Sequence, residues 1–221
     1  MKYSFLIIAL IFISLSSFSQ HKIKVEEDDY SFSVGRTNAL SVTIYESNKD
    51  DVEKEWKKFI KDYKAKVSIK KEIFADDAEI KDISSNVIDV YAVAEVDKDG
   101  NVILYVGFDL GGAFLSSSQH PDKFRYAKDM MYKFGKEATL TAIDGHLEAE
   151  GKILKKKESE QEKLVKENEQ LLKNIADWEK SIEKAKADIE TNKKDQELKL
   201  GEIEAQKKVV EEITDKKNKV D

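Results

Sequence analysis

The stretch IDVYAVAEVDKDGNVILYVGFDL, residues 88–110, decides the fold of the N-terminal part of the chain. Apolar side chains alternate with other residues on both sides of the turn-forming run DKDGN at 97–101. The alternating positions are Ile88, Val90, Ala92, Ala94 and Val96, then Val102, Leu104, Val106, Phe108 and Leu110. A period of two is typical of a half-buried strand. Two such runs around a Gly- and Asn-containing turn predict an antiparallel hairpin.

Further strand patterns precede this hairpin. Residues 38–45 also alternate, with Leu40, Val42 and Ile44 on one face and Ser41, Thr43 and Tyr45 on the other. Tyr30–Val34 is a candidate first strand, and Val67–Ile69 opens another that can resume at Ile73–Phe74. We therefore expect a mostly antiparallel sheet with one face on a core.

Two helices are expected beside this sheet. Ser47–Asp50 forms an N-terminal capping signal, and the apolar residues that follow it keep helical spacing. They are Val52, Trp56, Phe59, Ile60 and Tyr63. Gly111 and Gly112 end the sheet, and Pro121, the only proline, lies where the first turn of a helix tolerates it. We expect both helices to pack on one face of the sheet, which makes the head, residues 30–146, an α+β domain.

Residues 147–221 keep one heptad register without a slip, and half of them are charged. Such a repeat predicts a helix that buries a narrow seam against another helix. We expect the seam to form an oligomer interface through Leu154, Leu164, Leu171, Ile175, Trp178, Ile182, Ile189, Ile203, Val210 and Ile213. No strong helix stop separates the Pro121 helix from this segment, so one helix can run from the head into the coiled-coil tail.

Polar residues interrupt the seam. Gln161 and Asn168 occupy successive core positions, and Asn192, Gln196 and Lys199 fall close together. Two interpretations follow: a helical hairpin that bends near Thr191–Asp195, or a continuous helix that pairs with a second chain. Trp178 is large for a tight parallel dimer and suits a hairpin, a higher oligomer or a local contact.

The first residues have the pattern of an export signal. A basic start, an apolar run from Phe5 to Leu15 and small residues at Ser17 and Ser19 predict a signal peptide over 1–19 with cleavage before Gln20. A polar, flexible lead-in is then expected over 20–29. Cysteine is absent, which excludes a lipobox, disulfides and thiolate sites. The expected location is the periplasm or the exterior, without membrane insertion after cleavage.

The charge balance and the motif search exclude several functions. The chain has 38 Lys and Arg against 44 Asp and Glu, a formal net charge of −6, which is unsuited to nucleic-acid binding. Its three histidines lack metal-ligand spacing, and no nucleophile or phosphate-loop motif is present. We therefore expect no metal, no cofactor and no enzymatic activity. The acidic run at Asp76 and Asp77 could bind a cation, although a solvated loop explains it better.

Several short runs resemble a family of small exported proteins from flavobacterial-type bacteria. They are Ser17–Gln20, Phe32–Gly35, Asn38–Val42, Glu55–Lys58, Phe74–Ile80 and Phe108–Ser116, followed by the charged helical tail. The resemblance implies export and this architecture, and it implies no activity. It draws attention to a possible ligand site at Asp76, Asp77, Asp109, Gly111 and Gly112.

The function expected from these features is that of a non-enzymatic structural or interaction protein of the cell envelope. It would assemble through its tail and present its head to a partner protein. One alternative is a periplasmic holdase with helical arms, for which the acidic charge is unfavourable. Another is a head that binds a small ligand or catalyses a reaction.

Overall fold

The computed structural model describes residues 22–219, so the predicted signal peptide lies outside the described part. The chain divides into two compact units, Met1–Glu150 and Gly151–Asp221. The division falls close to the expected boundary between head and tail at residues 146 and 147. Each unit is described by itself below.

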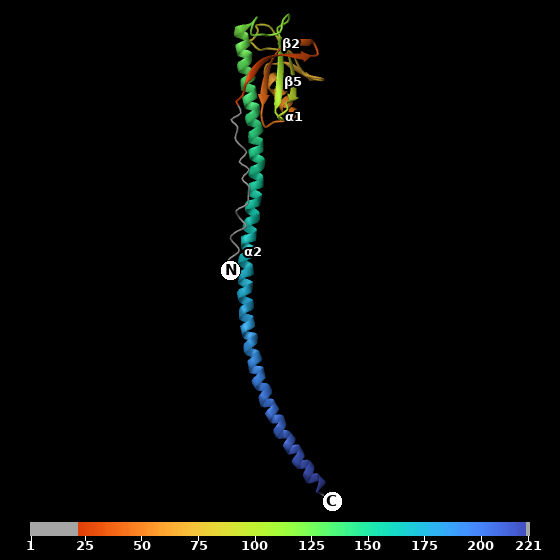
Figure 1. Cartoon of the computed structure of the whole chain (residues 1–221), viewed down its shortest axis with the longest axis vertical. Coiled ribbons are helices and arrows are strands. Elements are labelled where there is room, and N and C mark those ends of the chain that lie inside the picture. The colour runs from red at the N-terminus through yellow and green to blue at the C-terminus, as the bar shows by residue number, and fades with distance from the viewer. Residues whose placement is uncertain (1–21, 220–221) are drawn as a thin grey trace. The chain divides into compact units, whose positions relative to one another are not determined.

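The head unit contains one six-stranded sheet with the strand order β1-β2-β6-β5-β4-β3 (Figure 1). Every neighbouring pair is antiparallel. The strands are β1 Val25–Phe32, β2 Gly35–Ile44, β3 Lys66–Ile69, β4 Ile73–Ala78, β5 Ile88–Val96 and β6 Val102–Asp109. The helices are α1, Lys49–Lys61, and α2, Pro121–Asn218. The predicted α+β class, with an antiparallel sheet and a long C-terminal helix, is confirmed.

The hairpin β5–β6 forms as its alternation predicts. Val96 pairs with Val102, and the Asp97 N–H donates to the Asn101 carbonyl at 2.8 Å. The Asp97 carboxylate also accepts from the N–H groups of Asp99 and Asn101, at 2.9 and 2.8 Å. These bonds satisfy the polar groups of the turn within the turn itself, so its conformation depends on local sequence.

Two predictions on the strands are wrong. The lead-in expected over 20–29 is in part a strand, because β1 begins at Val25. The residues between Val25 and Phe32 are mostly acidic and exposed. Such a segment can still form a strand at the edge of a sheet, where backbone pairing on one side is sufficient and charged side chains are common. Asp76 and Asp77, expected in a solvated loop, lie inside β4 at an irregularity between Ala75 and Ala78.

Helix α1 begins where its cap predicts. The Asn48 side chain accepts from the Asp51 N–H at 3.0 Å, and Asp50 and Asp51 lie in the first turn, where the helix dipole favours negative charge. The helix ends at Lys61, so Tyr63 lies just beyond it. Val52, Trp56 and Ile60 form its buried face.

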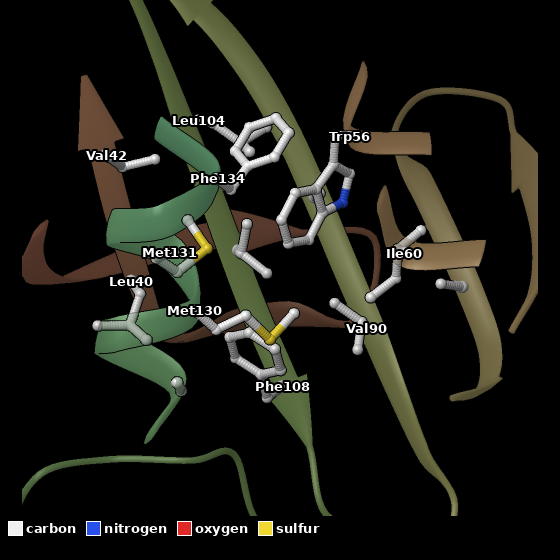
Figure 2. Close-up of a cluster of buried hydrophobic side chains, with 14 of the residues drawn as sticks. Leu40, Val42, Trp56, Ile60, Val90, Leu104, Phe108, Met130, Met131 and Phe134 are labelled. Atoms are coloured by element: carbon white, nitrogen blue, oxygen red, sulfur yellow. The ribbon is translucent and has the colours of Figure 1, made fainter. Parts of the chain in front are cut away.

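The core of the head unit combines side chains from the sheet, α1 and the first part of α2. Figure 2 shows Trp56 and Ile60 of α1 and Met131 and Phe134 of α2 pointing toward strand residues such as Leu104. The Trp56 and Phe134 rings meet edge to face with their centroids 5.0 Å apart, a favourable aromatic geometry.

Helix α2 is a single helix of 98 residues, labelled in Figure 1. It passes through Thr191–Asp195 without a break, and the Thr191 hydroxyl donates to the Ala187 carbonyl at 3.1 Å within it. The hairpin considered from the sequence is therefore wrong. Amide side chains at this point bond to each other instead, since Gln196 donates to Asn192. Within residues 22–219, no helix has both the length and the apolar character needed to cross a bilayer.

Candidate functional site

The acidic residues singled out from the sequence meet at one end of β4, β5 and β6. The irregularity in β4 places Asp77 in a left-handed backbone conformation, with φ at 57°, which Asp tolerates better than most residues. Its carboxylate lies 2.8 Å from the Lys66 ammonium, and its N–H donates to the Asp89 carboxylate at 3.3 Å. The sequence pattern did not indicate Asp89 as a member of this cluster, because only strand pairing brings it there.

Asp89 is the electrostatic centre of the cluster. It lies directly opposite Asp109 in the β5–β6 pairing. Burial raises the pKa of the Asp89 carboxyl, and the charges of Asp76, Asp109 and Asp77 raise it further, while the bond from the Asp77 N–H acts in the opposite direction. Like charges across a strand pair destabilise the sheet, so this cluster carries unfavourable electrostatic energy.

Gly111 and Gly112, which were predicted as part of a ligand site, form the turn beside this acidic cluster. Asp109 accepts from the Gly111 N–H at 2.9 Å, and Gly111 has a φ of 88°, a conformation that suits glycine. Asp109 also forms a bridge with Phe114. Gly111 and Gly112 thus turn the chain after β6. Among residues 22–219, no group of three or more His, Asp or Glu side chains is arranged to hold a metal ion.

The second face of the sheet carries a row of aromatic side chains that sequence analysis did not single out. The alternation that buries one set of strand residues in the main core places the other set on this face. Its members are Tyr30, Phe32, Phe74, Tyr91, Tyr105 and Phe114, with Ala39 and Val93. Tyr30 stacks on Tyr105 with centroids 4.4 Å apart, and Phe74 lies 4.9 Å from Tyr91. The signal was present in the sequence as a second alternating set, interleaved with the core positions.

The outer part of the β1–β2 hairpin arches over this aromatic face. Strand β2 pairs with β6 only from Leu40 to Ile44, so its first residues leave β6. The Ser33 N–H at the hairpin tip donates to the Glu72 carboxylate in the β3–β4 turn at 3.0 Å, and the Ser33 hydroxyl donates to it as well. β1 and β3 are the two edges of the sheet, so these bonds bring its opposite sides together.

Two further features support the arch. The Tyr30 hydroxyl in β1 donates to Glu95 in β5 at 2.6 Å, and burial together with this bond raises the pKa of Tyr30 above its ordinary value. Gly107 lies beneath the arch, where an added Cβ would lie 2.8 Å from the Phe32 ring. Only glycine lets the aromatic ring approach the sheet this closely.

A hollow of about 430 Å³ lies beside the hairpin tip. Phe74 and Tyr91 line it together with Val34, and Lys70, Lys71 and Glu72 lie at the β3–β4 turn. None of the residues predicted as a ligand site is among those that line it. Its apolar floor and charged edge are features that small-ligand pockets share.

In the tail unit, the predicted interface residues form an exposed stripe along α2. Their exposed fractions run from 44% at Ile203 to 61% at Trp178. No part of Gly151–Lys219 folds back on this stripe, because the unit is one helix. Large exposed apolar surfaces are a feature of interaction sites.

Comparison with known proteins adds no assignment. The chain matches no protein-family model, and neither a curated protein nor a solved structure is similar to it at a significant level. The function is therefore argued from the chain's own residues.

Proposed function

We propose that this chain is an exported, non-enzymatic structural or interaction protein of the cell envelope. It assembles with a second copy through a coiled coil of its tail and presents its α+β head to a partner protein. Cleavage after residue 19 releases it to the periplasm or the exterior. In this proposal α1 and the first part of α2 cover one face of the sheet, and the aromatic face lies on the other.

The observation that supports the proposal is the exposed heptad stripe on an uninterrupted helix. Each large apolar side chain that is buried contributes about 1.5–3 kcal/mol. The ten interface residues lie at heptad core positions between Leu154 and Ile213. Helix propensity and Glu–Lys pairs add little to this, since exposed pairs are worth only about 0.3–0.5 kcal/mol. Burial of the stripe against a second helix would thus stabilise the tail more than its helix propensity or its Glu–Lys pairs do.

Sedimentation of the mature chain, residues 20–221, tests this proposal. We expect an oligomer at micromolar concentration, and a monomer for a chain that ends at residue 150. The shortened chain should remain folded, because the buried residues of the described part all lie between Val25 and Thr139. A monomeric mature chain across the accessible concentration range would contradict the proposal.

A matched pair of substitutions separates the stripe from the rest of the helix. Ile182→Lys places a charge at a core position, and Ala187→Lys places the same charge on the opposite side of the helix. We expect Ile182→Lys to raise the dissociation constant at least tenfold, since a buried unpaired charge is costly. Ala187→Lys should leave association within about twofold.

The exposed stripe also fits the holdase alternative, in which an unfolded client covers it. That function predicts a monomeric tail that suppresses aggregation of an unfolded outer-membrane barrel, and Ile182→Lys should weaken the suppression. A stable oligomer without such suppression would favour the assembly function.

A further inference from the structure

The charges beside the stripe differ between its two edges. Counted in heptads a to g with Leu154 at a, the charged g positions are Glu160, Glu167, Asp188, Asp195 and Glu202, with Lys216 as a basic exception near the end of the helix. The e positions hold Lys186, Lys193 and Lys207, with Glu158 and Glu179 as acidic exceptions. One edge of the stripe is thus mainly acidic, and the C-terminal half of the other is basic.

We propose that two copies of the tail pair in parallel and in register, an inference that rests on the proposed assembly function. In this arrangement a g residue faces the e residue five positions later in the other copy. Asp188 then meets Lys193, and Glu202 meets Lys207. No g–e pair between residues 153 and 214 joins like charges. In an antiparallel pair g faces g and e faces e, so the acidic g edge would face itself.

The polar core residues favour the same arrangement. In a parallel, in-register pair each core residue meets its own copy, so Asn168 meets Asn168 and Gln161 meets Gln161. Amides can bond to each other, whereas a shift of one heptad would place Gln161 of one copy against Leu154 and Asn168 of the other against Ile175, at a cost. Asn192 and Gln196 already bond to each other within one helix, and pairing would join them with the same two residues of the second copy.

Lysines in and beside the stripe form ion pairs within their own helix that are compatible with the parallel arrangement. Lys199 occupies a core position, but its ammonium bonds to Glu202 at the edge. Lys193 pairs with Glu190 at 2.8 Å within its own helix, with both side chains more than 60% exposed. Such an exposed pair is worth little, so Lys193 can exchange it for Asp188 of the second copy. Lys157 is also at a core position and would face its own copy, as Trp178 would, so we expect looser packing at these two positions and at Asn192–Lys199 than along the rest of the pair.

Single cysteines test the orientation, because the natural chain has none. Leu154→Cys and Val210→Cys lie at core positions eight heptads apart, about 84 Å along a helix. A parallel, in-register pair predicts that each variant alone forms a disulfide-linked dimer in a glutathione redox buffer. Ser159→Cys, on the outer side of the helix, should remain largely reduced.

The outcomes separate this inference from the assembly function. If sedimentation under reducing conditions gives an oligomer but neither core variant links to itself, the parallel arrangement is wrong and assembly stands. If the natural chain is monomeric, and both variants are monomeric as well, the proposed assembly function is wrong. Should the cysteine substitutions themselves weaken association, the charge exchange below tests the g–e contacts with the core unmodified.

Charge exchange gives a second test that leaves the core intact. Asp188→Lys with Glu202→Lys should raise the dissociation constant of that variant about tenfold or more, through Lys–Lys contacts across the pair. Lys193→Glu with Lys207→Glu should act likewise. Mixing the two variants should restore association as a heterodimer. Failure of the mixture to associate more tightly than either variant alone would overturn the parallel register.

Discussion

Two glycines of α2 show how strongly a single position depends on its surroundings. A Cβ at Gly135 would lie 2.5 Å from Cγ2 of Val42, a buried and branched side chain, whereas a Cβ at Gly145 would meet nothing within 4 Å. Gly135 therefore permits close contact between α2 and β2. Gly145 carries only the usual entropic disadvantage of glycine in a helix.

We predict that Gly135→Ala lowers the free energy of unfolding of the head by about 1–2 kcal/mol, because overpacking outweighs the better helix propensity. Gly145→Ala should raise it by about 0.5–1 kcal/mol. Urea unfolding in a Trp178→Phe background leaves Trp56 as the only tryptophan and measures both. Equal effects from the two substitutions would contradict the close contact at Gly135.

At the same scale, Asp89→Asn is predicted to stabilise the head by about 0.2–1 kcal/mol. The amide keeps an oxygen to accept the Asp77 N–H and removes the repulsion from Asp109. Because the pKa of Asp89 is raised in the folded state, the natural chain loses stability as pH rises through that pKa. The advantage of the variant should therefore be full at neutral pH and vanish below the ordinary pKa of Asp.

Urea unfolding between pH 3 and pH 7 in the Trp178→Phe background measures this advantage. Asp99→Asn, in the exposed β5–β6 turn, is the control and should change stability by less than about 0.5 kcal/mol. A gain for Asp89→Asn that does not depend on pH would show that charge repulsion is not its cause.

At the scale of elements, the arch of the β1–β2 hairpin depends on few contacts at its tip. Glu72 accepts two bonds from Ser33, and these hold the hairpin over the aromatic face. Backbone pairing to β2 holds the rest of β1. The tip should therefore open locally before the sheet unfolds.

We predict that Glu72→Ala speeds amide hydrogen exchange at the tip, around Ser33, while exchange in β5 and β6 stays nearly unchanged. The lost bonds should cost about 1 kcal/mol in global stability. Glu26→Ala, which removes an exposed carboxylate from the same hairpin, serves as the control. Equal protection of the tip in both variants would mean that Ser33 and Glu72 do not hold the arch.

At the scale of the whole molecule, the two units are stabilised by different means. The head buries its apolar residues within itself, whereas the tail exposes its stripe. Stability that comes from association depends on protein concentration, and stability from an internal core does not.

Thermal unfolding should therefore show two transitions. We predict that the loss of helical circular dichroism from the tail shifts to higher temperature as protein concentration rises. The transition reported by Trp56 in the Trp178→Phe background should stay at one temperature, and it should persist in a chain that ends at residue 150. A single transition that shifts as a whole would mean that the two units unfold together.

Local patterns were sufficient wherever the chemistry of an element is local. The β5–β6 hairpin, a helix cap within Ser47–Asp50, the start of α2 at Pro121 and the α+β class all followed from the sequence. The heptad repeat also predicted a stripe, because helix periodicity depends on the chain alone. The charged edge strand β1 could not be predicted in this way, because its backbone pairing to β2 defines it and its side chains show no apolar pattern.

Only the tertiary structure decided which distant residues meet. Asp89 joins Asp76, Asp77 and Asp109 through strand pairing, and Ser33 meets Glu72 because the β1–β2 hairpin arches across the sheet. It also decided that the helix continues through Thr191–Asp195. The physical reason is that periodicity specifies which face of an element is apolar, while the partner of that face depends on packing between segments far apart in the chain.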